Sequence, residues 1–347
     1  MRVTLGGTGI TSHKNGFGAL PLQRVGLDAA VSLMRGAFEG GITYFDTARS
    51  YTDSEEKMGI ALEGVRDRVT IATKTPSLTP EGFWADIAAS LRLLRTDYID
   101  VYQFHNPPFM PAPGDGSGLY EAMLEAKAKG LIRHIGITSH RIDLAFDIVN
   151  SGLYATLQFP FSYLAGEREE VLVKLAAEKR VGFVAMKALS GGLIRRADAA
   201  FAFLARHENV LPIWGIQRQS ELAEFLSFME NPPRLTPELS GVVDRDRTEL
   251  RGEFCRGCGY CLPCPAGIAI NNCARTSLLL RRAPAAAWLS PEWQSEMAKI
   301  HDCVGCGHCS AHCPYGLDTP ALLRANLRDY EDVLAGKKFA EPGKLLK

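Results

Sequence analysis

Residues 99–105 of the chain read I-D-V-Y-Q-F-H, and residues 119–138 read L-Y-E-A-M-L-E-A-K-A-K-G-L-I-R-H-I-G-I-T. The first stretch is apolar and rich in β-forming residues, so it predicts a strand over Ile99–His105. In the second, apolar residues recur every three or four positions over Leu119–Lys129, which is the helical period. A second strand is expected over His134–Thr138. Such a strand–helix–strand unit indicates two parallel strands joined by an outer helix.

The same alternation runs up to about residue 230. The other expected strands are Gly16–Leu20, Thr43–Asp46, Val69–Lys74, Thr156–Phe159, Gly182–Met186 and Val210–Trp214. The other expected helices are Leu27–Glu39, Phe83–Leu94, Arg141–Asn150, Glu169–Lys179 and Ala197–Arg206. Eight βα units close into a (β/α)8 barrel, whose usual length of about 250 residues fits the space available. The sequence therefore predicts an α/β protein built on a TIM barrel.

The charge balance excludes some classes of partner. The 347 residues carry 39 basic and 39 acidic side chains, so nothing indicates nucleic-acid binding or attraction to an anionic membrane. No apolar run is long enough to span a bilayer, and the N-terminal residues lack the apolar core of a signal peptide. We expect no nucleic-acid partner and no membrane association.

Eight of the nine cysteines lie in two short runs near the C-terminus. Residues 255–265 read C-R-G-C-G-Y-C-L-P-C-P, and residues 303–314 read C-V-G-C-G-H-C-S-A-H-C-P. The second run has the C-x2-C-x2-C-x3-C-P spacing of bacterial ferredoxins, in which the fourth cysteine usually ligates the other cluster of a pair. Two such runs predict two 4Fe–4S clusters in a small, mainly helical, ferredoxin-like domain after the barrel.

The spacing divides the ligands between the two clusters. One cluster is expected on Cys255, Cys258, Cys261 and Cys313, and the other on Cys303, Cys306, Cys309 and Cys264. The first run is one residue short before its fourth cysteine, so Cys273 is an alternative to Cys264. Zinc sites use cysteine pairs rather than three cysteines in series, and disulfide scaffolds suit small secreted chains, so iron–sulfur is favoured over both. Cysteines held as thiolates need a reducing interior, which predicts a cytoplasmic protein.

The segment between the barrel and the cysteines breaks the strand–helix pattern. It holds three prolines and the charged run D-R-D-R, without a convincing strand. We expect four parts along the chain: the barrel over residues 1–230, a linker over 231–253, the two-cluster domain over 254–335 and a tail over 336–347.

Four polar side chains fall at the C-terminal ends of predicted strands, where active sites of such barrels gather. They are Asp46, Tyr51, Lys74 and His105. Lys74, paired with Asp46, favours the phenolate of Tyr51 and so makes the phenol a proton donor for carbonyl reduction. His105 is placed to hydrogen-bond the carbonyl oxygen. Each residue alone is more often structural, but four together at strand ends favour a catalytic set.

The chain resembles the aldo/keto reductases, specifically the branch that carries a C-terminal ferredoxin-like domain. The stretches that carry the resemblance are L-G-G-T-G-I (5–10), F-D-T-A-R-S-Y (45–51), A-T-K-T (72–75), Q-F-H-N (103–106), I-R-H-I-G-I-T-S-H (132–140), L-Q-F-P-F (157–161) and V-A-M-K-A-L-S-G-G (184–192). The resemblance implies NAD(P)H-dependent reduction of an aldehyde or ketone, or the reverse oxidation of an alcohol. It also implies that the same four residues form the catalytic tetrad, with Tyr51 as general acid.

The resemblance further implies where the nucleotide is held. Thr138, Ser139 and Gln158 are expected at the nicotinamide amide, although the family commonly has Ser-Asn in place of Thr138-Ser139, which makes His140 an alternative contact. Met186 stands where the family often stacks a tyrosine on the nicotinamide. Lys187 is expected to neutralise the pyrophosphate.

The choice between NADPH and NADH stays open in the sequence. The usual clamp for the 2′-phosphate of NADPH aligns with Gly215-Ile216 and Glu221. Glu221 repels a phosphate, and Arg218 is the nearby cation expected to contact the nucleotide.

Three functions are weighed for the whole chain. The favoured one is a carbonyl reductase acting on a small-molecule carbonyl or alcohol, with clusters in a structural or regulatory role. The second is a redox protein whose clusters relay single electrons between a redox partner protein and the barrel. The third is a non-catalytic interaction module. Substrate identity and oligomeric state are not readable from the residues, although the loop Pro107–Gly118 is expected to shape the substrate pocket.

Overall fold

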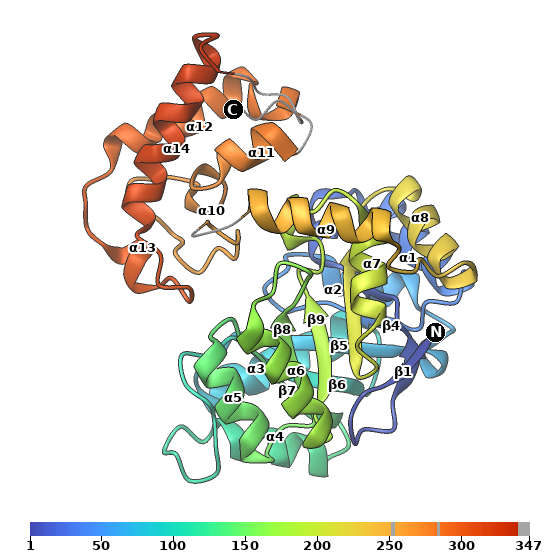
Figure 1. The fold of residues 1–347 in the computed structure, drawn as a ribbon. Coiled ribbons are helices and arrows are strands. Elements are labelled where there is room, and N and C mark those ends of the chain that lie inside the picture. Colours follow the sequence, from blue (N-terminus) through green and yellow to red (C-terminus); the bar gives the residue numbers. More distant parts are fainter. Residues whose placement is uncertain (251–253, 283–284, 339–347) are drawn as a thin grey trace. The chain divides into compact units, whose positions relative to one another are not determined.

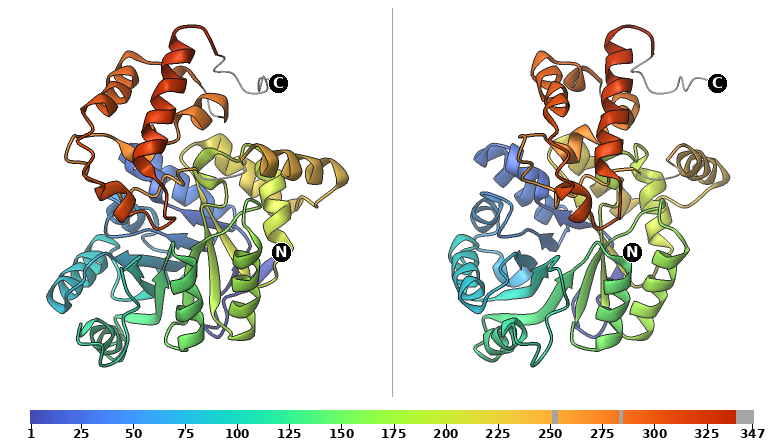
Figure 2. Two further views of the ribbon diagram at one scale, coloured as in Figure 1. Left: turned by 60° about the vertical axis from the view of Figure 1, so that its left-hand side comes forward. Right: turned by 90° about the vertical axis from the view of Figure 1, so that its left-hand side faces the viewer.

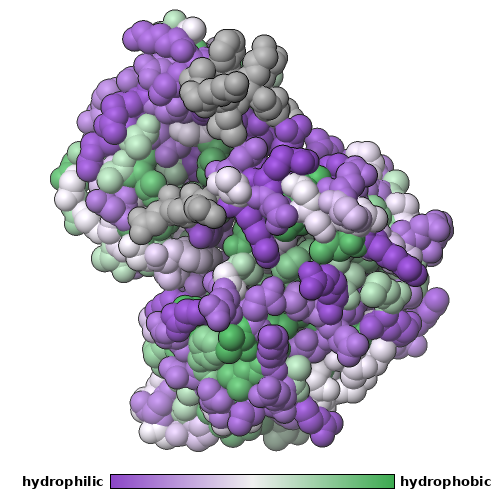
Figure 3. All heavy atoms as spheres, viewed as in Figure 1, coloured by the Kyte–Doolittle hydropathy of each residue, from purple (hydrophilic) through white to green (hydrophobic). Residues whose placement is uncertain are grey.

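The computed structural model describes residues 1–250, 254–282 and 285–338 of the chain. Its contacts divide the protein into two compact units. The first unit comprises Met1–Ala188 and Asp198–Leu239, and the second comprises Leu189–Ala197 and Ser240–Lys347. Polar side chains cover most of the visible surface of both units, with apolar ones scattered among them (Figure 3).

The first unit contains a closed barrel of eight parallel strands, in the order β10-β3-β4-β5-β6-β7-β8-β9. The predicted TIM barrel is therefore confirmed. Its strands are β3 (Gly16–Gly18), β4 (Tyr44–Asp46), β5 (Thr70–Thr75), β6 (Ile99–His105), β7 (Ile132–Thr138), β8 (Thr156–Pro160), β9 (Gly182–Met186) and β10 (Val210–Gly215). Nearly every residue in these strands is buried, as expected where helices cover a parallel sheet.

Helices lie outside the strand ring, as Figures 1 and 2 show. They are α1 (Leu27–Glu39), α2 (Ser54–Ala61), α3 (Pro80–Leu93), α4 (Leu119–Ala128), α5 (Ile142–Ser151), α6 (Glu167–Glu178), α7 (Ala197–Ala205) and α8 (Gln219–Glu230). Six of these match predicted helices within a few residues, whereas α2 and α8 were not among the expected ones. Helix α1, for example, buries Ala30, Leu33, Met34 and Ala37.

A short antiparallel hairpin precedes the barrel and was missed in the sequence. It pairs β1 (Arg2–Thr4) with β2 (Thr11–His13). Val3 and Leu5 are buried in one apolar cluster with barrel residues such as Val184, and Leu5 lies against Gly182, the first residue of β9. Gly6 has a positive φ of 52°, and a Cβ there would lie 2.2 Å from the Arg180 carbonyl oxygen. The hairpin thus packs at the N-terminal ends of the strands.

Hydrogen-bonded register sets neighbouring polar residues side by side at the opposite ends of the strands. Lys74 of β5 pairs with Gln103 of β6. His105 of β6 pairs with Thr138 of β7, and Thr138 pairs with Gln158 of β8. Because parallel strands all run the same way, these carboxyl-end residues gather at one mouth of the barrel.

The second unit is mainly helical, as predicted, and its described residues contain no strand. Its helices are α9 (Pro237–Glu249), which begins at the edge of the first unit, α10 (Ile270–Cys273), α11 (Thr276–Arg282), α12 (Pro291–Ala298), α13 (His308–Ala311) and α14 (Thr319–Leu334). Leu280, Met297, Leu323 and Tyr330 pack with several of the cysteines in a single apolar cluster. Among the described helices, none is both long and apolar enough to cross a membrane.

Parts of the expected linker and of the expected tail lie outside the described residues. Residues 231–253 include the 13-residue helix α9, while 251–253 lie outside the described residues. Of the expected tail 336–347, residues 339–347 also lie outside them. The structure adds one feature that the sequence did not indicate: Leu189–Ala197, within the expected barrel segment, groups with the second unit.

Candidate active site and cluster sites

The four predicted catalytic residues lie at the carboxyl ends of consecutive barrel strands. Asp46 is the last residue of β4, Lys74 lies one residue before the end of β5, and His105 ends β6. Tyr51 lies in the loop between β4 and α2, where its backbone N–H donates to the carbonyl oxygen of Ala48. A tight turn thereby follows Asp46 and brings the phenol back toward the strand ends.

A buried ion pair forms the base of this site. The Lys74 Nζ atom donates to Asp46 Oδ1 at 2.7 Å and to the Thr47 carbonyl oxygen at 2.6 Å. The Lys74 and Asp46 side chains are only 1% and 3% exposed. Gln158 Nε2 approaches Asp46 Oδ1 at 3.4 Å, and Gln103 Nε2 donates to Gln158 Oε1 at 3.1 Å. The pair is therefore held by its own strands, β4 and β5, and by the Gln158 amide of β8 on the opposite side of the barrel.

Tyr51 and His105 stand next to this ion pair. Their ring centroids are 5.7 Å apart with the rings nearly perpendicular. The ammonium of Lys74 lies 5.2 Å from the centre of the Tyr51 ring. A phenol that can donate a proton thus stands beside an imidazole, with a fixed cation close to both.

Burial changes the protonation of these groups. It raises the pKa of Asp46 and lowers that of Lys74, and the attraction between the two charges opposes each shift. Burial, followed by the charge of Lys74, lowers the pKa of His105 to about 3. Burial likewise holds the pKa of His140 well below its ordinary value, with Lys187 the next cause. Both imidazoles are therefore neutral near pH 7 and can each donate one N–H.

The expected nucleotide residues occupy the ends of the next four strands. Thr138 ends β7 and Ser139 follows it, Gln158 lies within β8, Met186 ends β9 before Lys187, and Gly215 ends β10 before Arg218. The Thr138 hydroxyl accepts from the Asn106 backbone N–H at 2.9 Å. Hydroxyls, an amide and a lysine suit a carboxamide and a phosphate, so the donor set fits a nicotinamide nucleotide.

Two residues of this mouth were missed as site members, although both stand in the quoted stretch Q-F-H-N. Gln103 links Gln158 to the strand that carries His105, as described above. Asn106 has a positive φ of 52°, and its side-chain oxygen accepts from the His140 backbone N–H at 3.0 Å. Asparagine tolerates a positive φ better than most residues. The asparagine at position 106 was therefore the signal that the sequence offered for this backbone conformation.

Arg218 and Glu221 contact each other. The Arg218 guanidinium donates to Glu221 Oε1 at 2.9 Å and 2.6 Å, and Glu221 Oε2 accepts from the backbone N–H groups of Gln217 and Arg218. Glu221 therefore caps helix α8 and partly neutralises the cation expected at the nucleotide.

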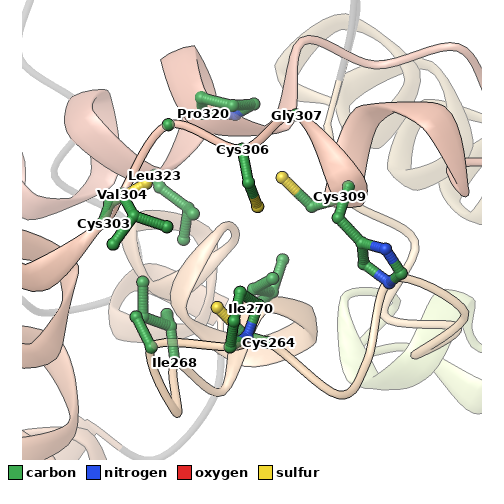
Figure 4. Close-up of a pocket in the computed structure, with 14 residues that line it drawn as sticks. Cys264, Ile268, Ile270, Cys303, Val304, Cys306, Gly307, Cys309, Pro320 and Leu323 are labelled. Atoms are coloured by element: carbon green, nitrogen blue, oxygen red, sulfur yellow. The ribbon is translucent and has the colours of Figure 1, made fainter.

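The second cysteine run lines a hollow in the second unit. Cys303, Cys306 and Cys309 contribute to its wall, and so does Cys264 of the first run, together with apolar residues such as Ile268 and Ile270. Figure 4 shows Cys306 and Cys264 reaching toward this space from two different loops. Four cysteines around one hollow fit the ligand set expected from ferredoxin spacing.

The first run forms a neighbouring group. Burial, followed by the nearby Cys255 and Cys258, raises the pKa of the Cys261 thiol to about 12. Burial, followed by the charge of Cys258, raises the pKa of Tyr315, and the charge of Cys313 acts in the same direction, so Tyr315 lies near a cysteine of each run. The crossed pairing of the two runs stays a prediction from the cysteine spacing.

Cys273 is placed differently from these eight cysteines. Its side chain is fully buried, and its Sγ atom faces the Glu296 carbonyl oxygen at 4.0 Å. Burial raises its pKa to about 12, with Glu296 the next cause. Cys273 does not line the hollow, whereas Cys264 does.

A family model described as the aldo/keto reductase family matches residues 3–208. The chain belongs to the aldo/keto reductases. A second model, described as a 4Fe-4S dicluster domain, matches residues 254–318. The family and the iron–sulfur domain expected from the sequence are thus confirmed.

Curated aldo/keto reductases are similar over the barrel. Aldo-keto reductase YhdN of Bacillus subtilis is 30% identical over 207 residues, which cover 54% of this chain and 61% of that protein. L-galactose dehydrogenase of Arabidopsis thaliana is 31% identical over 55% of this chain and 66% of its own length. Methylglyoxal reductase DkgB of Salmonella typhi is 32% identical over 54% and 71%. The chain thus spans less than two thirds of the length of the first two relatives and slightly more than two thirds of the length of the third.

Solved aldo/keto reductases share the barrel fold. An enzyme from Bacillus halodurans in its holo form matches with a TM-score of 0.61 and 23% identity, covering 71% of this chain and 95% of that one. An enzyme from Klebsiella pneumoniae in complex with NADPH matches with a TM-score of 0.60 and 22% identity over 71% and 95%. At this identity the likeness establishes the fold alone.

We predict that the His105 imidazole does not titrate between about pH 8 and about pH 5. Its pKa of about 3 lies below the ordinary 6.5, so the neutral form persists as the pH falls through this range. Nuclear magnetic resonance of histidine-labelled protein, with the signal assigned through His105→Gln, measures the titration. A midpoint near 6.5 would contradict the prediction.

Proposed function

We propose that the chain is an NAD(P)H-dependent carbonyl reductase that reduces an aldehyde or ketone, or oxidises the alcohol in reverse, with Tyr51 as general acid. The observation that carries the proposal is the buried Lys74–Asp46 pair beside Tyr51 and a neutral His105. A bound nicotinamide supplies the hydride to the carbonyl carbon. The protein must then deliver a proton to the oxygen.

Tyr51 is the group that delivers this proton. As the oxygen gains negative charge, the phenol hydroxyl transfers its proton and becomes a phenolate. The Lys74 cation, 5.2 Å from the ring centre, stabilises that phenolate, and Asp46 holds the cation in place. Neutral His105 donates an N–H to the same oxygen and orients the carbonyl without carrying a charge of its own.

The strand ends from β7 to β10 would hold the nucleotide. Thr138, Ser139 and Gln158 suit the nicotinamide amide, and Met186 suits a ring face. Lys187 suits the pyrophosphate, and Gly215 lets the backbone approach the nucleotide closely. One solved relative is described as an NADPH complex and one curated relative as NADH-specific, so the family holds both preferences.

The Arg218–Glu221 contact favours NADH over NADPH in this chain. A 2′-phosphate at Arg218 has to displace or neutralise a carboxylate that already accepts two guanidinium bonds. A free ribose hydroxyl, in contrast, can donate to the same carboxylate. The substrate is a small-molecule carbonyl or alcohol, the class that relatives named as methylglyoxal reductases act on.

We predict that Tyr51→Phe lowers the carbonyl reduction rate by about 10²–10⁴. The variant removes only the hydroxyl that donates the proton, so nucleotide binding should stay at the wild-type level. The reduction rate is followed by nucleotide absorbance over a panel of small aldehydes, and binding is measured by fluorescence titration. A variant that retains full reduction would defeat the proposed general acid.

We further propose that the second unit holds two 4Fe–4S clusters. The first takes Cys255, Cys258, Cys261 and Cys313, and the second takes Cys303, Cys306, Cys309 and Cys264. The shared hollow supports Cys264 as the fourth ligand, and the position of Cys273 beside Glu296 argues against the alternative.

We predict that Cys264→Ser loses about half of the iron per chain, because one of the two clusters lacks a thiolate. Cys273→Ser should retain the wild-type iron content and serves as the matched control. Iron and sulfide analysis of anaerobically purified protein measures both. Iron loss in the Cys273 variant, with full retention in the Cys264 variant, would reverse the ligand assignment.

Electron relay is a second candidate function, favoured by the exposure of one cluster loop. Cys303 and Cys306 are exposed, and Val304 between them is 70% exposed. Cys255 and Cys261 of the other set are buried. A cluster on the exposed loop would be open to a redox partner protein, whereas hydride transfer itself needs no such path.

We expect nucleotide binding without any change in the clusters, because hydride transfer moves both electrons together. An anaerobic titration with NADPH and then NADH, following the visible absorbance of the clusters, measures this. Bleaching by either nucleotide would instead favour the relay.

A further inference from the structure

The segment that follows β9 has a costly backbone conformation. Lys187 and Ser190 have positive φ angles of 54° and 49°, and Gly191 and Gly192 follow with 65° and 92°. Non-glycine residues in this backbone region persist only where the surroundings over-determine them, and they cluster at ligand sites. Some feature of the molecule must therefore hold the chain here.

Two arginines of the second unit contact Leu189–Ala197, the part of this segment that belongs to the same unit. Arg275 Nη1 donates to the Gly191 carbonyl oxygen at 3.1 Å. Arg282 Nη1 donates to the Leu193 carbonyl oxygen at 2.9 Å. Both donors are charged and both acceptors are backbone atoms, so the bonds fix the path of the chain rather than a side chain.

Arg275 also lies against the loop that carries the first cysteines. A Cβ at Gly257, between Cys255 and Cys258, would meet its guanidinium carbon at 2.6 Å. A Cβ at Gly191 would meet Arg275 Nη1 at 2.7 Å. The Arg275 guanidinium is thus packed between Gly257 of the cysteine loop and Gly191 of the segment. Because neither glycine has a Cβ, there is room for the guanidinium between them.

Arg282 is anchored from its other side. It is 8% exposed, and its Nη2 atom donates to Asp246 at 2.5 Å and to Glu249 at 2.8 Å, both in α9. Two carboxylates balance its buried charge, and Nη1 is left for the Leu193 carbonyl oxygen. The hydrogen bonds to Gly191 and Leu193 therefore come from arginines that are themselves held by other residues of the second unit.

We propose that Arg275 and Arg282 are positioning residues for nucleotide binding, which hold Leu189–Ala197 so that the adjoining Lys187 meets the nucleotide. The proposal rests on the proposed function, in which Lys187 contacts the pyrophosphate. Only Ala188 separates Lys187 from the segment, so the backbone itself carries the constraint.

The test compares Arg275→Ala and Gly191→Ala with Arg281→Ala in the full-length, cluster-loaded protein. Gly191→Ala disturbs the same contact from the segment side, without changing the cysteine loop. Arg281 is the matched control because it pairs with Asp329 inside the second unit, at 2.7 Å and 3.0 Å. Iron content is measured for every variant.

Two readouts are needed, and neither is enzyme activity. One is the dissociation constant for NADPH and NADH by fluorescence titration. The other is the rate of trypsin cleavage at Arg195 and Arg196, two exposed sites inside the segment. We expect Arg275→Ala and Gly191→Ala to weaken nucleotide binding roughly tenfold or more and to speed this cleavage, while Arg281→Ala matches the wild type.

Three results would overturn the proposal. Wild-type affinity in both test variants removes the positioning role and leaves the proposed function intact. An equal loss of affinity in Arg281→Ala shows a general effect of weakening the domain. A wild-type protein that binds neither nucleotide defeats the proposed function, and the positioning role falls with it.

Discussion

The ion pair between Lys74 and Asp46 is the interaction on which the barrel mouth depends. Both charges are almost fully removed from water, and removing either partner alone would leave an uncompensated buried charge that costs about 3–5 kcal/mol. The pair persists because it has two further partners, the carbonyl oxygen of Thr47 directly after β4 and the amide of Gln158 on β8. The same fixed cation lies beside the Tyr51 ring, and after burial it is the second cause of the lowered pKa of His105, so one ion pair influences the chemistry of both residues.

The stability of the second unit has a different physical basis. It is small and mainly helical, and several of its cysteines are part of an apolar cluster. A domain of this size gains stability when a bound metal group joins its loops, because few apolar side chains are available to do so. In the proposed ligand assignment two distant stretches of sequence share each cluster, so iron–sulfur ligation and folding would be parts of one process. Arg275 packs against one of these loops at Gly257 and also donates a hydrogen bond to the Gly191 carbonyl oxygen in the segment after β9.

Much of the fold was predictable because its signals are local. Strand and helix periodicity predicted all eight barrel strands, and cysteine spacing predicted the iron–sulfur domain. The hairpin of Arg2–Thr4 and Thr11–His13 was missed because most of its residues are not buried, so it lacks the buried run that marks the equally short strands β3 and β4. Helix α2 was missed because its apolar residues do not gather on one face: Ser54, Glu55 and Lys57 are all buried. The buried environment of those polar residues comes from distant parts of the chain.

The sequence by itself determined the barrel, the family and the candidate residues, since residue type and spacing along the chain carry those signals. It placed Asp46, Tyr51, Lys74 and His105 at strand ends, but their distances and the neutral state of His105 depend on strand register and burial. The location of Cys264 beside the second cysteine run, and of Cys273 away from it, was likewise decided by tertiary structure. So was the grouping of Leu189–Ala197 with the cluster domain. Contacts between residues far apart in sequence leave no local pattern, and only the folded chain brings them together.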